Sequence, residues 1–107
     1  MQTENLMYVS TRGTGWGVPA SRAILEGIAP DGGLYTPAAL PVLTQEDIEV
    51  LQGMSYPDRA AHILQKFLTD YAPERLKDIA AKAYASFDHP DVAPVVPLDD
   101  TTGILEL

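Results

Sequence analysis

The sequence contains no cysteine, which excludes a disulfide framework and a thiolate metal site. It is also poor in basic residues, with 7 Lys and Arg against 15 Asp and Glu and a formal net charge of -8 at pH 7. A balance this acidic opposes general binding to nucleic acid or to anionic membranes, because their phosphate groups repel it. We therefore expect neither a nucleic acid nor a membrane among its partners.

Long hydrophobic runs are scarce as well. No stretch approaches the roughly 20 apolar residues that cross a bilayer, and the first residues, MQTENLMYVS, hold neither a basic leader nor an apolar run. These features predict a cytoplasmic protein. With 107 residues, 46% of them hydrophobic and 21% charged, the chain has the size and composition of one small globular domain.

The first third of the chain predicts two short strands around one helix. The stretch Leu6 to Thr11 is rich in β-formers and predicts a strand. Pro19 suits the first turn of a helix, and Gly27 is a typical stop. Pro-Asp-Gly-Gly at 30–33 is strong turn chemistry, and a second strand is expected at 34–36. We expect the two strands to pair as a ribbon that needs helices packed on it.

Start signals mark three further helices. Thr44 is a good N-cap, and Asp47 lies at the capping-box position of the same helix. A third helix begins near Pro57, and a fourth begins at Pro73 and ends before Pro90. Both carry an apolar face at helical spacing, and we expect these faces to form a shared core. The faces consist of Ala60, Leu64, Phe67, Leu68 and Tyr71 in the third helix and of Leu76, Ile79, Ala80, Ala83 and Phe87 in the fourth.

These elements predict an α+β fold, a small, mostly helical domain with about four helices and a short two-stranded ribbon. We expect this domain to span residues 1–87. Residues 88–102 carry Pro90, Pro94 and Pro97 and predict an extended connector without a packed element. Residues 103–107, GILEL, are typical of a further strand, so we expect them to begin the next domain of a longer chain.

The loop STRGTGWG, from Ser10 to Gly17, places three glycines and an arginine before the first helix. Its spacing does not fit the dinucleotide fingerprint, because Val18 stands at the third required glycine, and a Walker lysine is also missing. The hydroxyls of Ser10 and Thr11 and the guanidinium of Arg12 could together contact one phosphate or carboxylate. The alternative is structural: the hydroxyls bond local backbone, and Arg12 pairs with an acidic side chain.

The other polar residues complete no catalytic or metal-binding constellation. His62 and His89 have no partner at a metal-ligand spacing, so we expect them to be hydrogen-bonded or solvated. Asp99 and Asp100 precede two threonines, which predicts a turn and not an acid–base pair. None of the lysines has the context of a reactive amine, since all lie on polar helical faces. The lysines are Lys66, Lys77 and Lys82.

Five strings, taken in order along the chain, resemble the N-terminal portion of threonine synthase. They are YVSTRG, ILEGIAPDGGLYTP, SYPDRAAHIL, AYASFDHPDVAPVVPL and ILEL. The resemblance extends from about Met7 to Leu107, and its most specific string is GIAPDGGLYTP at 27–37. The family implies a pyridoxal-phosphate-dependent lyase of fold type II. Such enzymes convert O-phospho-L-homoserine and water to L-threonine and phosphate in threonine biosynthesis.

The resemblance also implies where the reactive groups lie. In the family, the LEL string runs into a Phe-His-Gly-Pro-Thr segment shortly before the lysine that binds the cofactor, so this lysine is expected beyond Leu107. The chain alone is then expected to be inactive, with no catalytic, cofactor-binding or metal-binding residue, and to pack on its own catalytic domain. Ser10, Thr11 and Arg12 are the candidates for contact with the phosphorylated amino-acid substrate. Two alternatives are a threonine-synthase-like phospho-lyase and a free-standing helical interaction module.

Overall fold

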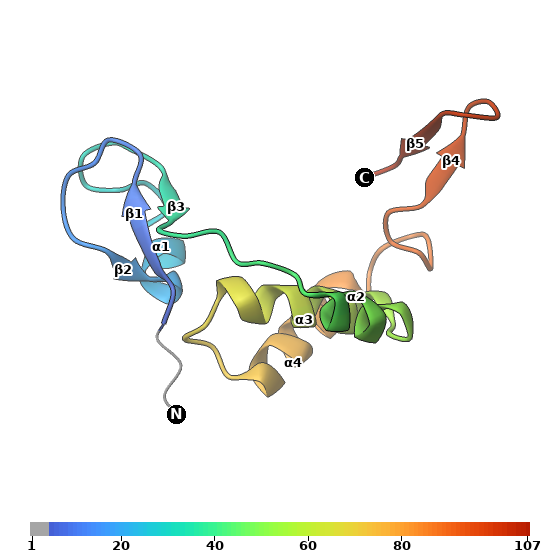
Figure 1. Cartoon of the computed structure of the whole chain (residues 1–107), viewed down its shortest axis with the longest axis horizontal. Helices are drawn as coiled ribbons and strands as arrows, with labels where there is room; N and C mark the ends of the chain where they lie inside the picture. The colour runs from blue at the N-terminus through green and yellow to red at the C-terminus, as the bar shows by residue number, and fades with distance from the viewer. Residues whose placement is uncertain (1–4) are drawn as a thin grey trace.

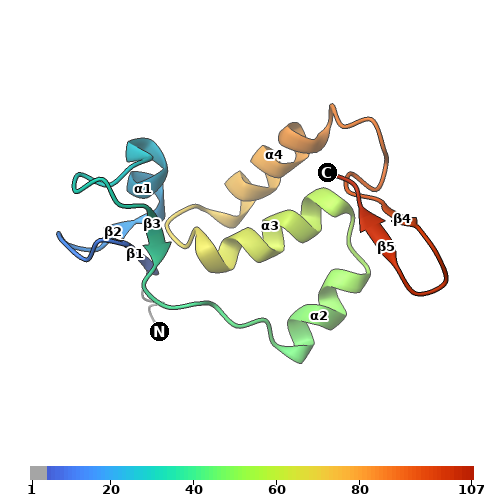
Figure 2. The same cartoon turned by 90° about the horizontal axis from the view of Figure 1, so that it is seen from above.

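The computed structural model describes residues 5–107 of the chain. In chain order its elements are β1 (Met7–Ser10), β2 (Val18–Pro19), α1 (Ala20–Glu26), β3 (Tyr35–Pro37), α2 (Gln45–Gln52), α3 (Tyr56–Phe67), α4 (Pro73–Tyr84), β4 (Val95–Pro97) and β5 (Gly103–Leu105). The first three strands and α1 form a β unit at one end of the molecule (Figure 1). The hairpin β4–β5 lies at the other end, and α2, α3 and α4 lie between the two (Figure 2).

The α+β class and the four helices expected from the sequence are confirmed. In the β unit, β1 is the central strand and pairs antiparallel with β2 and with β3. Tyr8 of β1 lies opposite Val18 on one side and Pro37 on the other. The expected ribbon of β1 and β3 is therefore present, and β2 adds a third strand to it. Because β2 has two residues, it is too short to show the alternation that predicts a strand.

The helices begin where the local signals predict. The Thr44 hydroxyl accepts from the N–H of Asp47 at 3.1 Å, and the Asp47 carboxylate accepts from the N–H of Thr44 at 2.8 Å, which completes the capping box of α2. Ser55 caps α3, and Pro73 is the first residue of α4. Within residues 5–107, no helix combines the length and the apolar character needed to span a bilayer.

The helical core is built around one leucine. Leu76 and Ala80 of α4 are buried against Ala61 of α3, and the two helices lie side by side (Figure 2). The expected shared core is therefore confirmed in part, because Ile79 and Ala83, which were expected on the same face of α4, are exposed. Phe87 was expected on the face of α4, but α4 ends at Tyr84 and leaves Phe87 beyond it and 48% exposed. The N–H of Phe87 donates to the carbonyl oxygen of Tyr84, a bond over three residues that closes the last turn of the helix.

The β unit is attached to the helices just after α3. The Tyr8 hydroxyl donates to the carbonyl oxygen of Phe67 at 2.8 Å. The backbone N–H of Ser21, in the first turn of α1, donates to Asp70 Oδ2 at 3.1 Å. The residue that precedes α1 is a proline without a side-chain acceptor, so Asp70 supplies the cap of this helix from a distant segment.

The hairpin at the far end lies largely within the expected connector. Strand β4 falls inside residues 88–102, so this segment does contain a paired element, contrary to expectation. Prolines are tolerated there because an edge strand does not need every N–H for pairing. The turn expected at the paired aspartates is confirmed, since the N–H of Thr101 donates to Asp99 Oδ1 at 2.9 Å.

Candidate functional site

The glycine-rich loop closes onto the Pro-Asp-Gly-Gly turn, and Asp31 lies at the centre of this contact. Asp31 Oδ1 accepts from Ser10 Oγ at 2.6 Å and from the N–H of Gly33 at 2.9 Å. Asp31 Oδ2 accepts from the hydroxyl of Thr14 and from its N–H, the latter at 3.3 Å. Ser10 precedes Asp31 by 21 residues. Loop and turn are therefore one folded unit at the end of β1 (Figure 1).

The donors around Asp31 favour its ionised form. The Ser10 hydroxyl has the largest effect, followed by the Thr14 hydroxyl and the N–H of Gly33, and together they hold the pKa of the Asp31 carboxyl well below its usual range. The group therefore stays charged at neutral pH. It serves as a fixed hydrogen-bond acceptor and not as a general acid or base.

The three predicted site residues all lie on this unit, where Ser10 is buried and Thr11 and Arg12 are exposed. Ser10 is 8% exposed, and its hydroxyl donates to Asp31 Oδ1. The Thr11 hydroxyl accepts from the N–H of Leu34 at 3.0 Å. Arg12 is exposed, and its Nη1 donates to the backbone oxygen of Asp31 at 3.0 Å. A guanidinium has several N–H donors, so Arg12 retains donors and a positive charge that a carbonyl oxygen does not neutralise.

Two glycines of the turn make room for these side chains. A Cβ on Gly32 would lie 2.7 Å from Arg12 Nη1. A Cβ on Gly33 would overlap Ser10 Oγ and lie 3.1 Å from the backbone nitrogen of Arg12. Gly32 also has a φ of +84°, which a residue with a side chain adopts only under strain. The sequence indicated a turn here. The close contact of this turn with Ser10 and Arg12 depends on tertiary structure, which the local sequence does not specify.

A second polar cluster joins α2 to α3. Asp47 accepts from Lys66 Nζ at 2.9 Å and from His62 Nε2 at 3.0 Å, in addition to its bonds within the capping box. Lys66 contributes most, followed by the N–H of Thr44, to holding the pKa of the Asp47 carboxyl well below its usual range. His62 is hydrogen-bonded, as the sequence predicted. Both basic side chains therefore connect α3 to the first turn of α2 through Asp47.

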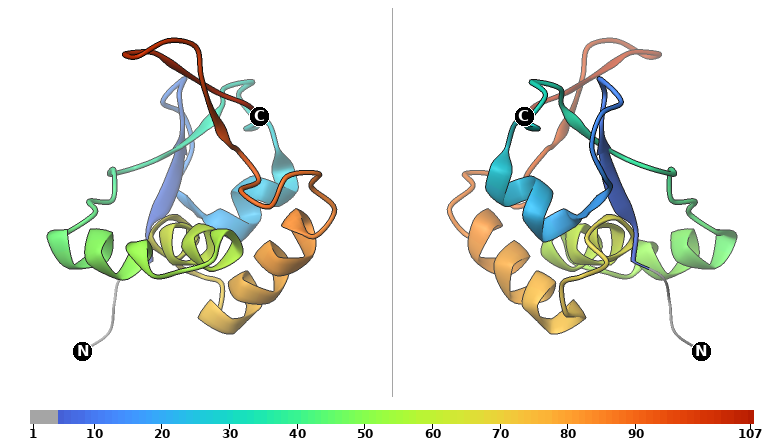
Figure 3. Two further views of the ribbon diagram at one scale, coloured as in Figure 1. Left: turned by 90° about the vertical axis from the view of Figure 1, so that its right-hand side faces the viewer. Right: turned by 90° about the vertical axis from the view of Figure 1, so that its left-hand side faces the viewer.

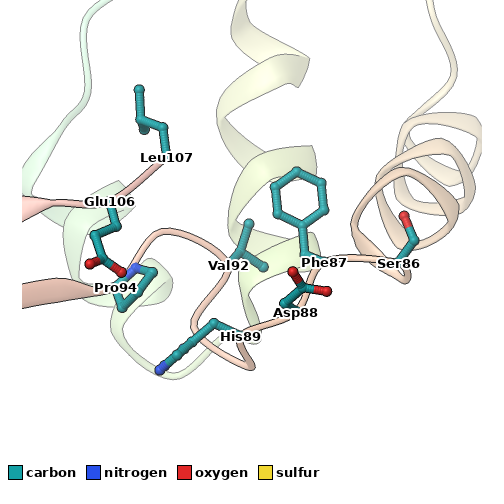
Figure 4. Close-up of a pocket in the computed structure, with 8 residues that line it drawn as sticks. All are labelled: Ser86, Phe87, Asp88, His89, Val92, Pro94, Glu106 and Leu107. Carbon is teal, nitrogen blue, oxygen red and sulfur yellow. The ribbon is translucent and has the colours of Figure 1, made fainter.

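A cleft of about 410 Å³ lies between the end of α4 and the end of β5 (Figure 4). Phe87 and Val92 form part of its apolar lining, and Glu106 and His89 contribute polar groups. His89 Nδ1 accepts from the N–H of Asp91 at 3.0 Å. Across residues 5–107, no three His, Cys, Asp or Glu side chains are placed to hold a metal ion. The predicted site residues lie at the opposite end of the molecule from this cleft (Figure 1).

The described residues form a small α+β unit in which Asp31 and Asp47 connect loops, caps and helices of the same chain. The family model "Threonine synthase N terminus" matches residues 7–84, and the chain belongs to this family. The family that the sequence resembles is thereby confirmed.

Individual proteins agree with the family match. The chain is 40% identical over 101 residues to threonine synthase of Corynebacterium glutamicum, in an alignment that covers 87% of this chain and 21% of that protein. It is 34% identical over 104 residues to Threonine synthase-like 2 of Mus musculus, covering 95% and 22% of the two chains. The crystal structure of PLP-bound threonine synthase from Brucella melitensis matches with a TM-score of 0.87 at 37% identity, over 95% and 22% of the two chains. The chain thus spans about a fifth of the length of these relatives.

The three lysines of this chain do not fit a pyridoxal phosphate site. Lys66 is ion-paired with Asp47, and Lys82 is ion-paired with Asp78 at 3.0 Å. Lys77 is exposed to solvent. A lysine that forms an imine is activated by desolvation or by a neighbouring cation, whereas a carboxylate partner stabilises its charged, unreactive form.

Proposed function

We propose that this chain is the N-terminal domain of a threonine synthase, a pyridoxal-phosphate-dependent lyase of the cytoplasm. The complete enzyme converts O-phospho-L-homoserine and water to L-threonine and phosphate in threonine biosynthesis. The observation that carries the proposal is the likeness, at a TM-score of 0.87 over 95% of the chain, to a solved threonine synthase. Because the lysines of this chain are ion-paired or exposed, the cofactor would be held by the rest of the polypeptide.

The partner of this domain, in this proposal, is the catalytic part of the same polypeptide. An exposed apolar surface on the β unit supports it, since Trp16 is 94% exposed, Leu25 81% and Ile28 64%. Large apolar side chains that remain in water are candidates for burial against a partner. The two aliphatic residues lie on and just after α1, and the tryptophan lies in the loop that Asp31 holds in place.

Arg12 is the residue of this domain that we assign to the phosphate of the substrate. A guanidinium binds phosphate through parallel N–H groups, which gives both charge and orientation. The backbone oxygen of Asp31 fixes one end of the Arg12 side chain, and Gly32 leaves space for it. Ser10, which the sequence suggested together with Thr11 and Arg12, would act indirectly by holding the loop, because its hydroxyl donates to Asp31. Thr11 would also hold the loop, since its hydroxyl accepts from the N–H of Leu34.

The function is tested on the full-length protein that carries this sequence, loaded with pyridoxal phosphate and given O-phospho-L-homoserine. We expect L-threonine and phosphate to appear in equal amounts. A second candidate is a threonine-synthase-like phospho-lyase of other chemistry, which the 34% identity to Threonine synthase-like 2 favours. That enzyme would release phosphate without forming threonine, and this result would contradict the proposal.

The role of Arg12 is tested with Arg12→Ala in the same enzyme. Loss of a hydrogen bond to a charged group costs roughly 1.5–3 kcal/mol, so we expect KM for the phosphorylated substrate to rise by about 10-fold or more. The control is Arg75→Ala, because Arg75 is exposed on α4 and far along the chain from the loop. A KM that is the same in both variants as in the wild-type enzyme would remove Arg12 from the site.

A further inference from the structure

The hairpin β4–β5 carries apolar side chains on both of its faces. Residues directly opposite each other in an antiparallel pair share a face, so Val95 and Leu105 lie on one face and Val96 and Ile104 on the other. Their exposed fractions are 68%, 58%, 38% and 50%. A strand pair with one face in water alternates apolar and polar residues. This composition is therefore typical of strands that are covered on both sides.

Nothing in the described part of the chain provides that cover. The hairpin lies at the opposite end of the molecule from the β unit (Figure 1) and rises away from the three helices (Figure 3). All six residues of the two strands are exposed. An isolated two-stranded hairpin is at best marginally stable in water, and its stability normally comes from a third strand or from a packed helix.

The hydrogen bonds that flank the hairpin fix which backbone groups point outward. The N–H of Leu98 donates to the oxygen of Thr102 at 2.8 Å, and the N–H of Glu106 donates to the oxygen of Pro94 at 2.9 Å. In an antiparallel ladder, hydrogen-bonded pairs alternate with pairs whose N–H and C=O groups point away from the partner strand. The pair midway between these two bonds, Val96 and Ile104, is therefore hydrogen-bonded within the hairpin. The pairs on either side of it point their backbone polar groups away from the hairpin.

The two outer edges of the hairpin consequently differ. On β4, the outward positions are Val95 and Pro97, and Pro97 has no N–H to donate. Proline on an edge strand is a common device against further pairing. On β5, the outward positions are Gly103 and Leu105, and each offers both an N–H and a C=O. Within residues 5–107, neither the N–H of Gly103 nor that of Leu105 donates to a backbone oxygen outside the hairpin. The edge of β5 is thus open to another strand.

We propose that a strand from the remaining part of the polypeptide pairs with the outer edge of β5, within a sheet that is covered on both faces. The inference rests on the proposed function, which makes this chain one domain of a longer enzyme. Relatives of which this chain is about a fifth have ample further chain to supply the strand and its cover. The other source of an edge strand is a second copy of the protein, and the experiment separates the two.

The first test is hydrogen–deuterium exchange of the full-length protein, resolved to single amides. The amides of Gly103 and Leu105 should exchange as slowly as that of Ile104, which is bonded within the hairpin, and far more slowly than that of Val95. Rapid exchange at Gly103 and Leu105 overturns the proposal. Protection that disappears on dilution also overturns it, because the strand then comes from a second copy.

The second test compares two proline variants of the full-length protein. Val95 and Leu105 lie opposite each other, and both point their N–H away from the partner strand. Val95→Pro and Leu105→Pro therefore remove an outward donor without removing a bond between β4 and β5. We expect Leu105→Pro to lower Tm by about 3 °C or more beyond the change in Val95→Pro. Equal values of Tm in the two variants contradict the proposal.

Neither measurement depends on turnover. A protein that protects the edge of β5 but forms no threonine from O-phospho-L-homoserine refutes the proposed reaction and leaves the strand pairing intact. A protein that forms threonine while the amides of Gly103 and Leu105 exchange freely supports the proposed reaction and refutes the strand pairing.

Discussion

Asp31 and Asp47 each connect a local turn or cap to a distant part of the chain. Asp31 accepts from Gly33, two residues later, and from Ser10, 21 residues earlier. Asp47 completes the cap of α2 and also accepts from His62, 15 residues later. Because one carboxylate serves both partners, the local element and the tertiary contact stabilise each other. Small changes next to these carboxylates should therefore have effects beyond their own turn.

Gly33→Ala tests this coupling at Asp31. The added Cβ would overlap Ser10 Oγ and crowd the backbone of Arg12, so the loop must shift or the hydrogen bond to Asp31 must break. Overpacking of this kind costs about 1–3 kcal/mol, and we expect a lower Tm of the full-length protein in thermal denaturation. The matched control is Gly53→Ala, because a Cβ at Gly53 meets no atom within 4 Å. Equal stability of the two variants would show that the contact between Gly33 and Ser10 can adjust without loss of stability.

At the scale of elements, the pair α3–α4 depends on a single large buried side chain. Leu76 is 2% exposed, whereas its core neighbours Ala61 and Ala80 are small. Partly buried hydrophobic residues complete the contact around these three, and they are Ala60, Leu64, Leu68, Tyr71 and Tyr84. Ile79, on the same helix, is 41% exposed and provides a comparison of similar size in the same element.

Leu76→Ala should cost about 2–5 kcal/mol, because it removes buried methyl groups and leaves a cavity between the helices. Ile79→Ala should cost less than about 1 kcal/mol, since much of the Ile79 side chain is already in water. Denaturant unfolding followed by circular dichroism would measure both values in the full-length protein. Similar losses in the two variants would mean that Ile79 is covered by another part of the enzyme.

The helices could be predicted from the sequence because their signals are local. The capping box from Thr44 to Asp47 spans four residues, and Pro73 at the start of α4 acts at its own position. The distant partners of Asp31, Thr14 and Ser10, are 17 and 21 residues away, and no pattern within the turn specifies them. Arg12 was found as a candidate from the sequence. Its hydrogen bond to the backbone oxygen of Asp31 was not, because Asp31 lies 19 residues later in the chain. Strands β2 and β4 are too short to be recognised without the strands they pair with, whereas the strand expected within residues 103–107 is confirmed by β5.

At the scale of the whole molecule, the chain is more extended than a compact domain. Its Cα radius of gyration is 16.6 Å, against about 13 Å for a compact domain of this length. Within residues 5–107, the buried apolar residues are few and mostly alanine: Ala20, Ala23, Ala29, Ala61, Leu76 and Ala80. Larger apolar side chains remain exposed at both ends, on the β unit and on the hairpin. This distribution fits a domain that completes its packing against the rest of its enzyme, as we propose.

Trp16 reports on that packing, because it is the single tryptophan of this sequence and is 94% exposed within it. If the β unit docks on the catalytic part, the indole leaves water. In the full-length protein, the emission of Trp16 is obtained as the difference between wild type and Trp16→Phe. We expect this emission to be blue-shifted and weakly quenched by acrylamide, with the denatured protein as the exposed reference. Quenching as strong in the native state as in the denatured state would mean that this surface stays free, and the contact with the catalytic part would then have to lie at α2 or at the hairpin.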